Sequence, residues 1–446
     1  MAWKKVSNTR WERPMNGFEG YFAAVAKLTA SIAEGREHYT MSSILKLDLE
    51  SSDPTFSLRD AWKQMRYEQP QIAAVSEGMT KSYEVPDDEA LEEWLAGSFI
   101  VSDANSAEEL YQSAATGRIT HAATLHYVPK SSELLFRGQH YTIDGIGVFM
   151  FWDAYLKALA SPMKDIRFGD ETSRLAPALE EVLGYTEPPT PEQAEKAKAL
   201  FMDWATVIPG VGPVSKVGAA PPGKCRHTEL IVPPETTEAI IKACKEKNTT
   251  VTAALHAAYV STAIKHADPK SKSDEYVTAN SFDLRTYLPE PYDSSNYALA
   301  VYYSPRFFRH PLPSSYWDIE SALKKAYHTT FKGNQEALAT NAHFGQAMYE
   351  GAQSPEFLKT PIPRDALVSS LGMAERYMKR EYGGGIKATD IKFYIDVVLG
   401  MSMFHFYTFR DQLRIIYNYN DGFEEEENIQ KYLDEVLETL KRELLS

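Results

Sequence analysis

Cysteine is scarce in this chain. Only Cys225 and Cys244 occur in 446 residues, too few for a disulfide framework and not in the spacing of a metal site. We therefore expect two plain thiols, a reducing compartment and no metal. Long apolar runs are also lacking, since none reaches the about 18 residues of a membrane span, and residues 1–5 lack the apolar core of a signal peptide. We expect a cytoplasmic protein with no membrane partner.

Basic residues are fewer than acidic residues in this chain. The chain has 47 Lys and Arg against 61 Asp and Glu, a net charge of −14 and a pI near 5.4. This average field repels nucleic-acid phosphates, and no long basic run reverses it locally, so we expect no nucleic-acid partner. A small anionic ligand is still compatible, because a few cations around one site set the local potential.

Apolar residues make up 43% and aromatic residues 12% of the sequence, as in a folded enzyme. The length suggests two or three domains. Residues 207–226 contain four prolines and four glycines with little periodicity, which indicates a boundary. We predict an N-terminal domain at 1–206, a linker at 207–226 and a C-terminal domain at 227–446.

Helical and strand patterns alternate in both halves, which predicts an α/β fold with mixed sheets flanked by helices. Residues 122–128 and 133–139 predict a strand pair, and residues 145–159, apolar on most sides, predict a buried helix. In the second half we expect strands at 297–308 and 391–399, a long helical tract at 316–351 and a final amphipathic helix.

His140 and Asp144 lie where the second of the paired strands gives way to the buried helix, in the string HYTIDGIG at 140–147. A strand delivers the histidine, a tight turn holds the aspartate, and two glycines let the backbone bend into the helix. Imidazole suits proton removal near neutral pH, so His140 is the predicted general base. The alternative is a core histidine hydrogen-bonded to Asp144.

Asp144 either orients the imidazole or pins the turn by pairing with a cation, and we favour the second role. Arg285, in the Asp-x-Arg string that ends a predicted strand, is the candidate cation, because guanidinium is a planar two-pronged donor. Asp283 supports it, although a solvated Asp283–Arg285 pair is the alternative. Gly145, at the helix start, is the predicted N–H donor to an oxyanion.

The strand, the HxxxDG string and the helix together resemble the HxxxD acyltransferase superfamily, which includes BAHD enzymes, trichothecene acetyltransferases and peptide-synthetase condensation domains. The likeness covers most of the chain. The DFGWG string of plant members is absent, since residues 394–402 are YIDVVLGMS, so we expect a stand-alone fungal or bacterial member. Supporting strings are WERP at 11–14, NSFDLR at 280–285, SSLG at 369–372 and FRDQLR at 409–414.

The resemblance implies two chloramphenicol-acetyltransferase-like domains in a V around a central channel, with His140 at its middle. Ser402, near the segment equivalent to DFGWG, is a candidate second oxyanion donor or channel residue. Lys216, Lys224 and Arg226, around the predicted linker, are candidates for binding coenzyme A phosphates, against the alternative of solvated loop cations.

The function expected from these features is acyl-CoA-dependent transfer of an acyl group, acetyl being one candidate, to a hydroxyl or amine of a hydrophobic small molecule in secondary metabolism. His140 acts as general base in a ternary complex, acyl-CoA is a co-substrate, and no cofactor is permanently bound. The alternatives are a condensation or product-release enzyme that takes its thioester from a carrier protein, a cyclase, and a non-catalytic binding protein on the same fold.

Overall fold

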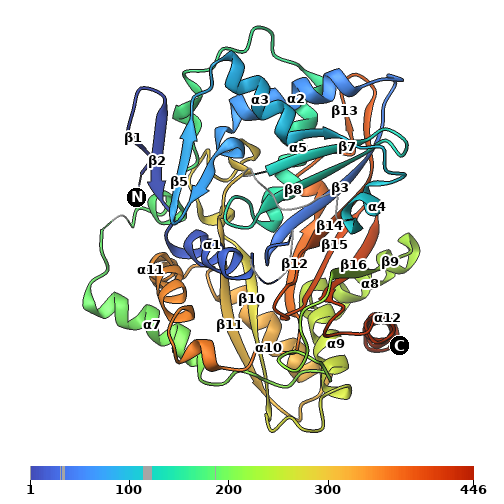
Figure 1. The fold of residues 1–446 in the computed structure, drawn as a ribbon. Helices are drawn as coiled ribbons and strands as arrows, with labels where there is room; N and C mark the ends of the chain where they lie inside the picture. The colour runs from blue at the N-terminus through green and yellow to red at the C-terminus, as the bar shows by residue number, and fades with distance from the viewer. Residues whose placement is uncertain (1, 31, 33–35, 114–122, 186) are drawn as a thin grey trace. The chain divides into compact units, whose positions relative to one another are not determined.

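The chain forms two compact units, each of mixed helix and sheet, in a computed structural model that describes residues 2–30, 32, 36–113, 123–185 and 187–446 (Figure 1). The first unit comprises Met1–Pro188, Asp283–Tyr303 and Ala374–Ile395. The second comprises Pro189–Phe282, Ser304–Met373 and Asp396–Ser446. The predicted α/β class is confirmed. The chain enters each unit more than once, and residues 207–226, predicted as a linker, lie within the second unit.

The central sheet of the first unit has six strands in the order β13-β14-β3-β8-β7-β6. β7 and β8 form the predicted antiparallel pair, although residue 122 lies outside the described residues. β14 pairs antiparallel with β3, so residues from late in the chain complete the sheet. The strands are β3 (Thr40–Asp48), β6 (Phe99–Val101), β7 (Ala123–Val128), β8 (Glu133–Gln139), β13 (Glu381–Tyr382) and β14 (Ile386–Ile395).

A smaller sheet in the first unit has the order β1-β2-β5-β4. Its strands are β1 (Lys4–Lys5), β2 (Arg10–Pro14), β4 (Val75–Glu77) and β5 (Thr80–Glu84). β2 and β5 run antiparallel with Arg13 directly opposite Lys81. This register brings two cations together beneath the helix that follows β2.

Helix α5 (Gly145–Ala160) matches the buried helix predicted at 145–159 to within one residue. It has buried residues on nearly every side. Its apolar surface packs within the first unit, where α2 lies against it (Figure 1). The other helices of this unit are α1 (Gly17–Thr29), α2 (Thr55–Glu68), α3 (Asp88–Ser98), α4 (Ala107–Gln112) and α6 (Leu179–Val182).

The second unit is built on a four-stranded sheet in the order β12-β15-β16-β9. Helices α8, α9 and α12 share one hydrophobic core with this sheet, and α12 buries the apolar face predicted for the final helix. The strands of this sheet are β9 (Cys225–Val232), β12 (Leu367–Met373), β15 (Met403–Phe409) and β16 (Gln412–Asn420), and a separate two-stranded sheet pairs β10 (Glu275–Asp283) with β11 (Tyr303–Pro311). The helices are α7 (Pro191–Ala205), α8 (Pro234–Glu246), α9 (Val251–Lys265), α10 (Tyr316–Thr329), α11 (Gln335–Ala352) and α12 (Glu426–Leu445).

Three element predictions were wrong in extent. The tract at 316–351 is two helices, because Gly333 has a φ of 68° and the Asn334 side chain caps α11 by accepting a hydrogen bond from the Ala337 N–H. The strand predicted at 297–308 begins only with β11, since the Tyr302 N–H donates to the Asp144 carboxylate instead of to a neighbouring strand. The strand predicted at 391–399 ends at Ile395.

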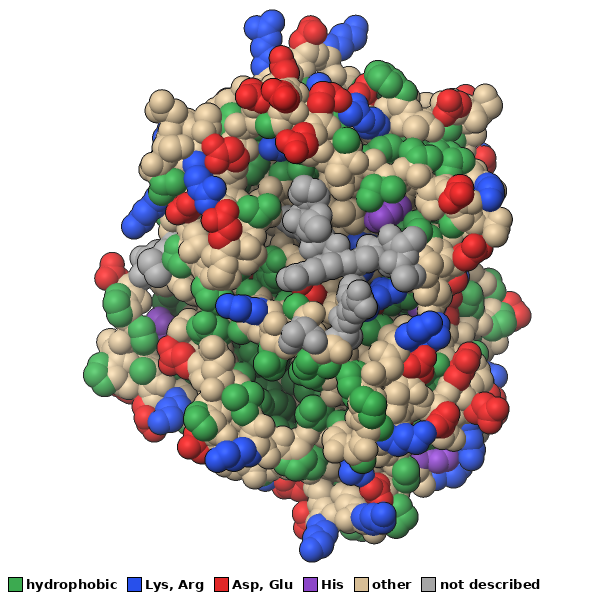
Figure 2. Space-filling view, in the orientation of Figure 1, with side chains coloured by type: hydrophobic (Ala, Val, Ile, Leu, Met, Phe, Trp, Pro, Cys, Tyr) green, Lys and Arg blue, Asp and Glu red, His purple; other side chains and the backbone are tan. Residues whose placement is uncertain are grey.

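Charged side chains of both signs are interspersed over the face seen in Figure 2. Among the helices in the described ranges, none combines the length and the apolar character needed to cross a bilayer.

Candidate active site around His140

His140 lies in the turn that joins β8 to α5. β8 pairs with β3 up to Gln139, and the Gln139 carbonyl then accepts hydrogen bonds from the Thr142 N–H (2.8 Å) and the Ile143 N–H (3.3 Å). These two bonds close a tight turn directly after the strand. The turn ends at Asp144, which caps α5 by accepting a hydrogen bond from the Gly147 N–H at 2.8 Å. His140 is therefore held between a sheet and a buried helix.

Asp144 is a hub of buried polar contacts. One nitrogen of Arg285, Nη1, lies 2.9 Å from both carboxylate oxygens, and the Tyr302 N–H donates to Oδ2 at 2.8 Å. Asp144 and Arg285 are each only 2% exposed. No hydrogen bond joins Asp144 to the His140 ring among the described residues. The geometry therefore favours the pinning role over direct orientation of the imidazole.

Arg285 was expected to bond to Asp144 through two nitrogens, but a single nitrogen, Nη1, makes both contacts. Its Nη1 also lies 3.2 Å from Asp283 Oδ1, and its Nη2 donates to the Ala300 carbonyl at 3.4 Å. Burial lowers the pKa of Arg285, but the charges of Asp144 and Asp283 outweigh it and hold that pKa above its ordinary value. Burial likewise raises the pKa of Asp283, against the opposing charge of Arg285. The guanidinium thus remains charged between two carboxyl groups.

The imidazole of His140 is stacked on an aromatic ring. The Phe22 ring from α1 lies 3.8 Å away between centroids, with the planes only 9° apart, while Tyr303 and Tyr39 lie at 5.9 and 6.1 Å. The half-buried His140 has an Nδ1 without a hydrogen-bond partner among the described residues. This packing restricts rotation of the ring and leaves an uncharged imidazole among apolar surfaces.

The surroundings of His140 disfavour its protonated form. Burial lowers the pKa of the imidazole to about 4, against smaller opposing effects of the nearby backbone carbonyls and of the Asp144 charge. The ring is therefore uncharged at neutral pH, which is the state that accepts a proton.

Gly145 opens α5, and its N–H has no acceptor among the described residues. The first N–H groups of a helix have no partner within the helix and carry the positive end of its dipole. This group fits the predicted role of donor to a developing negative charge.

The remaining predicted residues belong to the second unit. Ser402 precedes β15, is buried, and accepts a hydrogen bond from the Leu367 N–H through its carbonyl at 2.8 Å. Lys216 pairs with Glu425, and Arg226 pairs with Asp421 at 2.9 Å. The Lys224 backbone N–H also donates to Asp421. The oxyanion and coenzyme A roles of these residues stay predictions.

Sequence reasoning missed Phe22, Tyr303 and Lys81, all of which lie close to the turn. Lys81 donates a hydrogen bond to the Tyr141 carbonyl at 2.8 Å. The WERP string at 11–14 could have pointed to Lys81, because the arginine of that string, Arg13, lies opposite Lys81 in the small sheet. Nothing local marked Phe22 as the ring that stacks on the histidine.

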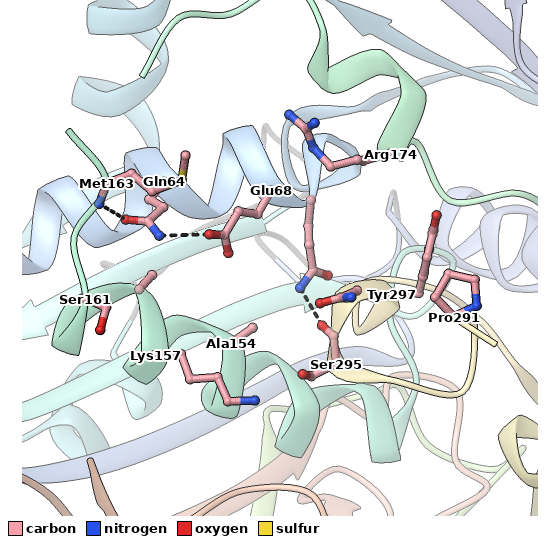
Figure 3. A pocket seen from close by; sticks show the side chains of 13 residues that line it. Gln64, Glu68, Ala154, Lys157, Ser161, Met163, Arg174, Pro291, Ser295 and Tyr297 are labelled. Atoms are coloured by element: carbon pink, nitrogen blue, oxygen red, sulfur yellow. Dashed lines mark hydrogen bonds between the residues drawn. The ribbon is translucent and has the colours of Figure 1, made fainter. Parts of the chain in front are cut away.

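A cavity of about 570 Å³ lies in the first unit at the C-terminal end of α5, which is the end away from His140 (Figure 3). Its lining includes Gln64, Glu68, Lys157, Arg174 and Tyr297 and none of the predicted site residues. In the described part of the chain, no group of three or more His, Cys, Asp or Glu side chains is placed to hold a metal ion.

Known proteins resemble the chain over nearly its whole length, although no family model matches it. The acetyltransferase pigO of Monascus ruber is 26% identical over 438 residues, covering 95% of this chain and 94% of that protein. The O-acetyltransferase pigM of the same species is 25% identical, covering 100% of this chain and 87% of pigM. The solved trichothecene 15-O-acetyltransferase of Fusarium sporotrichioides has a TM-score of 0.82 at 19% identity, covering 98% of this chain and 96% of that chain.

The fold is thus that of the two-domain, chloramphenicol-acetyltransferase-like enzymes. These relatives and this solved structure are consistent with the HxxxD acyltransferase superfamily that the HxxxDG string predicted, and the protein is an acyltransferase.

Proposed function

We propose that the protein transfers an acyl group, acetyl in the first instance, from acyl-CoA to a hydroxyl of a hydrophobic small molecule in secondary metabolism, with His140 as general base. The observation that carries the proposal is the position of His140, in a turn that ends at the buried Asp144–Arg285 ion pair and in surroundings whose burial lowers the pKa of the imidazole. The acetyl group and the oxygen acceptor are supported by the pigO and pigM relatives. The alternative amine acceptor has no such support.

The proposed reaction is direct transfer. The unprotonated ring nitrogen of His140 takes the proton of the acceptor hydroxyl while the hydroxyl oxygen attacks the thioester carbonyl. The tetrahedral oxyanion that forms accepts a hydrogen bond from the Gly145 N–H. The C–S bond then breaks, the imidazolium returns its proton to the departing sulfur, and the products are an ester and free coenzyme A. No acyl-enzyme intermediate forms.

The test is thiol release from acetyl-CoA in the presence of a panel of primary, secondary and phenolic alcohols. We expect release that depends on the alcohol and is lost in His140→Ala. Donor alone should leave the intact mass of the protein unchanged, and an added acyl mass would contradict direct transfer. If acetyl-CoA and longer acyl-CoAs give no release with any alcohol, the coenzyme A donor is wrong and a carrier-bound thioester replaces it.

A further inference from the structure

Three charged side chains form a buried cluster in the first unit, outside the residues assigned to the reaction. Glu19 of α1 receives a double hydrogen bond from Arg13, with Nη1–Oε2 at 2.5 Å and Nη2–Oε1 at 2.8 Å. Lys81 of β5 donates to the same carboxylate at 3.0 Å. All three residues are at most 7% exposed. A cluster of this kind is costly to bury, so packing alone does not explain it.

The strand register makes that cost higher. Arg13 and Lys81 lie directly opposite each other in the β2–β5 pair, and like charges in that position repel. Glu19 lies against both and offsets the repulsion, so the carboxylate holds two cations in fixed places. Burial would raise the pKa of Glu19, yet the charges of Arg13 and Lys81 lower it to about 2, and the carboxylate is ionised throughout the neutral range.

One hydrogen bond of Lys81 extends outside the cluster and reaches the turn of His140. Its ammonium donates to the carbonyl of Tyr141, the residue that follows His140, at 2.8 Å. Helix α1 meets the same turn a second time, because Phe22, three residues after Glu19, stacks on the imidazole. The cluster therefore ties the small sheet and α1 to the backbone next to His140.

We propose that Lys81 is a positioning residue, which fixes the backbone beside His140 through the Tyr141 carbonyl, while Glu19 and Arg13 hold its ammonium in place. The turn then has two anchors, Lys81 at the His140 end and Arg285 at the Asp144 end. Lys81 touches neither substrate in this role. The proposal rests on the proposed function of His140 as general base.

The test compares Lys81→Met with Arg66→Met. Arg66 is a matched control, because it is also a buried cation of the first unit that donates to a backbone carbonyl, that of Glu84. Its guanidinium lies over the Trp94 ring, so these contacts involve no residue of the turn. Lys81→Met should fold, since it leaves Arg13 and Glu19 as a neutral pair. Activity is measured with acetyl-CoA and each alcohol that the parent acetylates, and His140→Ala is assayed beside the two variants.

We expect Lys81→Met to lower kcat about ten- to a hundredfold with KM within threefold, because small displacements of a reacting group have effects of that size. Arg66→Met should lower thermal stability and leave kcat within twofold. Hydrogen exchange gives a readout that does not depend on turnover: the amides of Thr142, Ile143 and Gly147, all bonded within the turn, should exchange faster in Lys81→Met only.

The proposal is overturned if Lys81→Met keeps kcat within twofold of the parent while His140→Ala is inactive, or if exchange in the turn is unchanged. An active His140→Ala would refute the proposed function instead, and exchange would still decide whether Lys81 anchors the turn.

Discussion

The carboxylate of Asp144 joins three parts of the first unit, since it caps α5, accepts the Tyr302 N–H and pairs with Arg285. Each partner comes from a different stretch of sequence, and each contact is buried. A carboxylate with this many donors fixes the end of the turn in one place. Removing its charged partner leaves a buried charge that water cannot reach.

Arg285→Met should therefore lower the free energy of unfolding by about 3–5 kcal/mol, the usual effect of removing one partner of a buried ion pair. The control is Arg309→Met in the second unit, where the exposed pair with Glu275 should contribute about 1 kcal/mol or less. Urea unfolding of both variants measures the difference. Equal, small losses would show that the buried pair does not hold the turn.

The depressed pKa of His140 has a kinetic consequence. A protonated imidazole cannot take a proton, and burial moves protonation from the ordinary value of 6.5 to about 4. We expect kcat/KM to stay level from pH 8 to about pH 5 and to fall only near pH 4. The profile is measured by thiol release, with samples returned to pH 7.5 to separate titration from unfolding. An acid limb near pH 6.5 would contradict this environment for the ring.

At the scale of elements, the start of α5 is held by a close backbone approach. A Cβ on Gly147 would lie 2.4 Å from the Ala298 carbonyl oxygen, so only glycine fits there without movement of the helix or of the 295–302 segment. The helix start also carries the Asp144 cap and the Gly145 N–H. Any shift of the helix therefore shifts the proposed oxyanion donor.

Gly147→Ala should lower the free energy of unfolding by about 1–3 kcal/mol, as overpacking does, and should reduce kcat in the protein that remains folded. Gly383→Ala is the control, because its added Cβ would meet only the Ala160 Cβ at an ordinary 3.8 Å. Thermal unfolding and thiol release on the two variants test this. A fully active and stable Gly147→Ala would exclude a rigid helix start.

The sequence predicted the elements around His140 well because their signals are local. A strand pair, a tight turn and an apolar helix follow one another within 38 residues, from 123 to 160. The contact of Arg285 with Asp144 was expected from the Asp-x-Arg string and is present. The positions of Phe22 and Lys81 depend on how α1 and β5 pack against the turn, and no local pattern encodes such packing. The break between α10 and α11 was missed because Gly333 and Asn334 are short interruptions of a long periodic tract.

At the scale of the whole molecule, buried ionisable groups set the pH range of stability. Burial lowers the pKa of His38 and His256 to about 3 and that of His126 to about 4. Below pH 6.5 these histidines bind protons in the unfolded chain but remain unprotonated in the folded one. The free energy of unfolding therefore falls as the pH drops from 6.5 toward 4. Asp365 acts in the opposite direction, because burial raises its pKa to about 8 and its Oδ2 has no partner among the described residues.

Between its ordinary value of 3.8 and about pH 8, folded Asp365 keeps a proton that the unfolded chain has released, so stability falls as the pH rises through this window. Asparagine does not ionise. The melting temperature of Asp365→Asn should therefore decline less than that of the parent between pH 6.5 and 8.5. The exposed Asp434→Asn should follow the parent. Calorimetry at both pH values measures this, and parallel declines in all three proteins would contradict a buried neutral acid.

The interleaved segments predict that the N-terminal portion does not fold alone. A fragment of residues 1–206 lacks β14, the neighbour of β3, and lacks Arg285, the partner of Asp144. It would expose a sheet edge and leave a buried carboxylate uncompensated. We expect no cooperative melting by circular dichroism and aggregation on concentration. A sharp thermal transition for the fragment would show that β14 is dispensable.

The pairing of β14 with β3 also bears on how the protein is made. A ribosome releases β3 early, yet the strand beside it is complete only when residue 395 of 446 has emerged. The first unit therefore stays incompletely folded through most of translation. During that time its hydrophobic strands are exposed and can pair with non-native segments or with other chains. Yield of this protein in a heterologous host should depend more on chaperone supply and elongation rate than on the stability of the finished molecule.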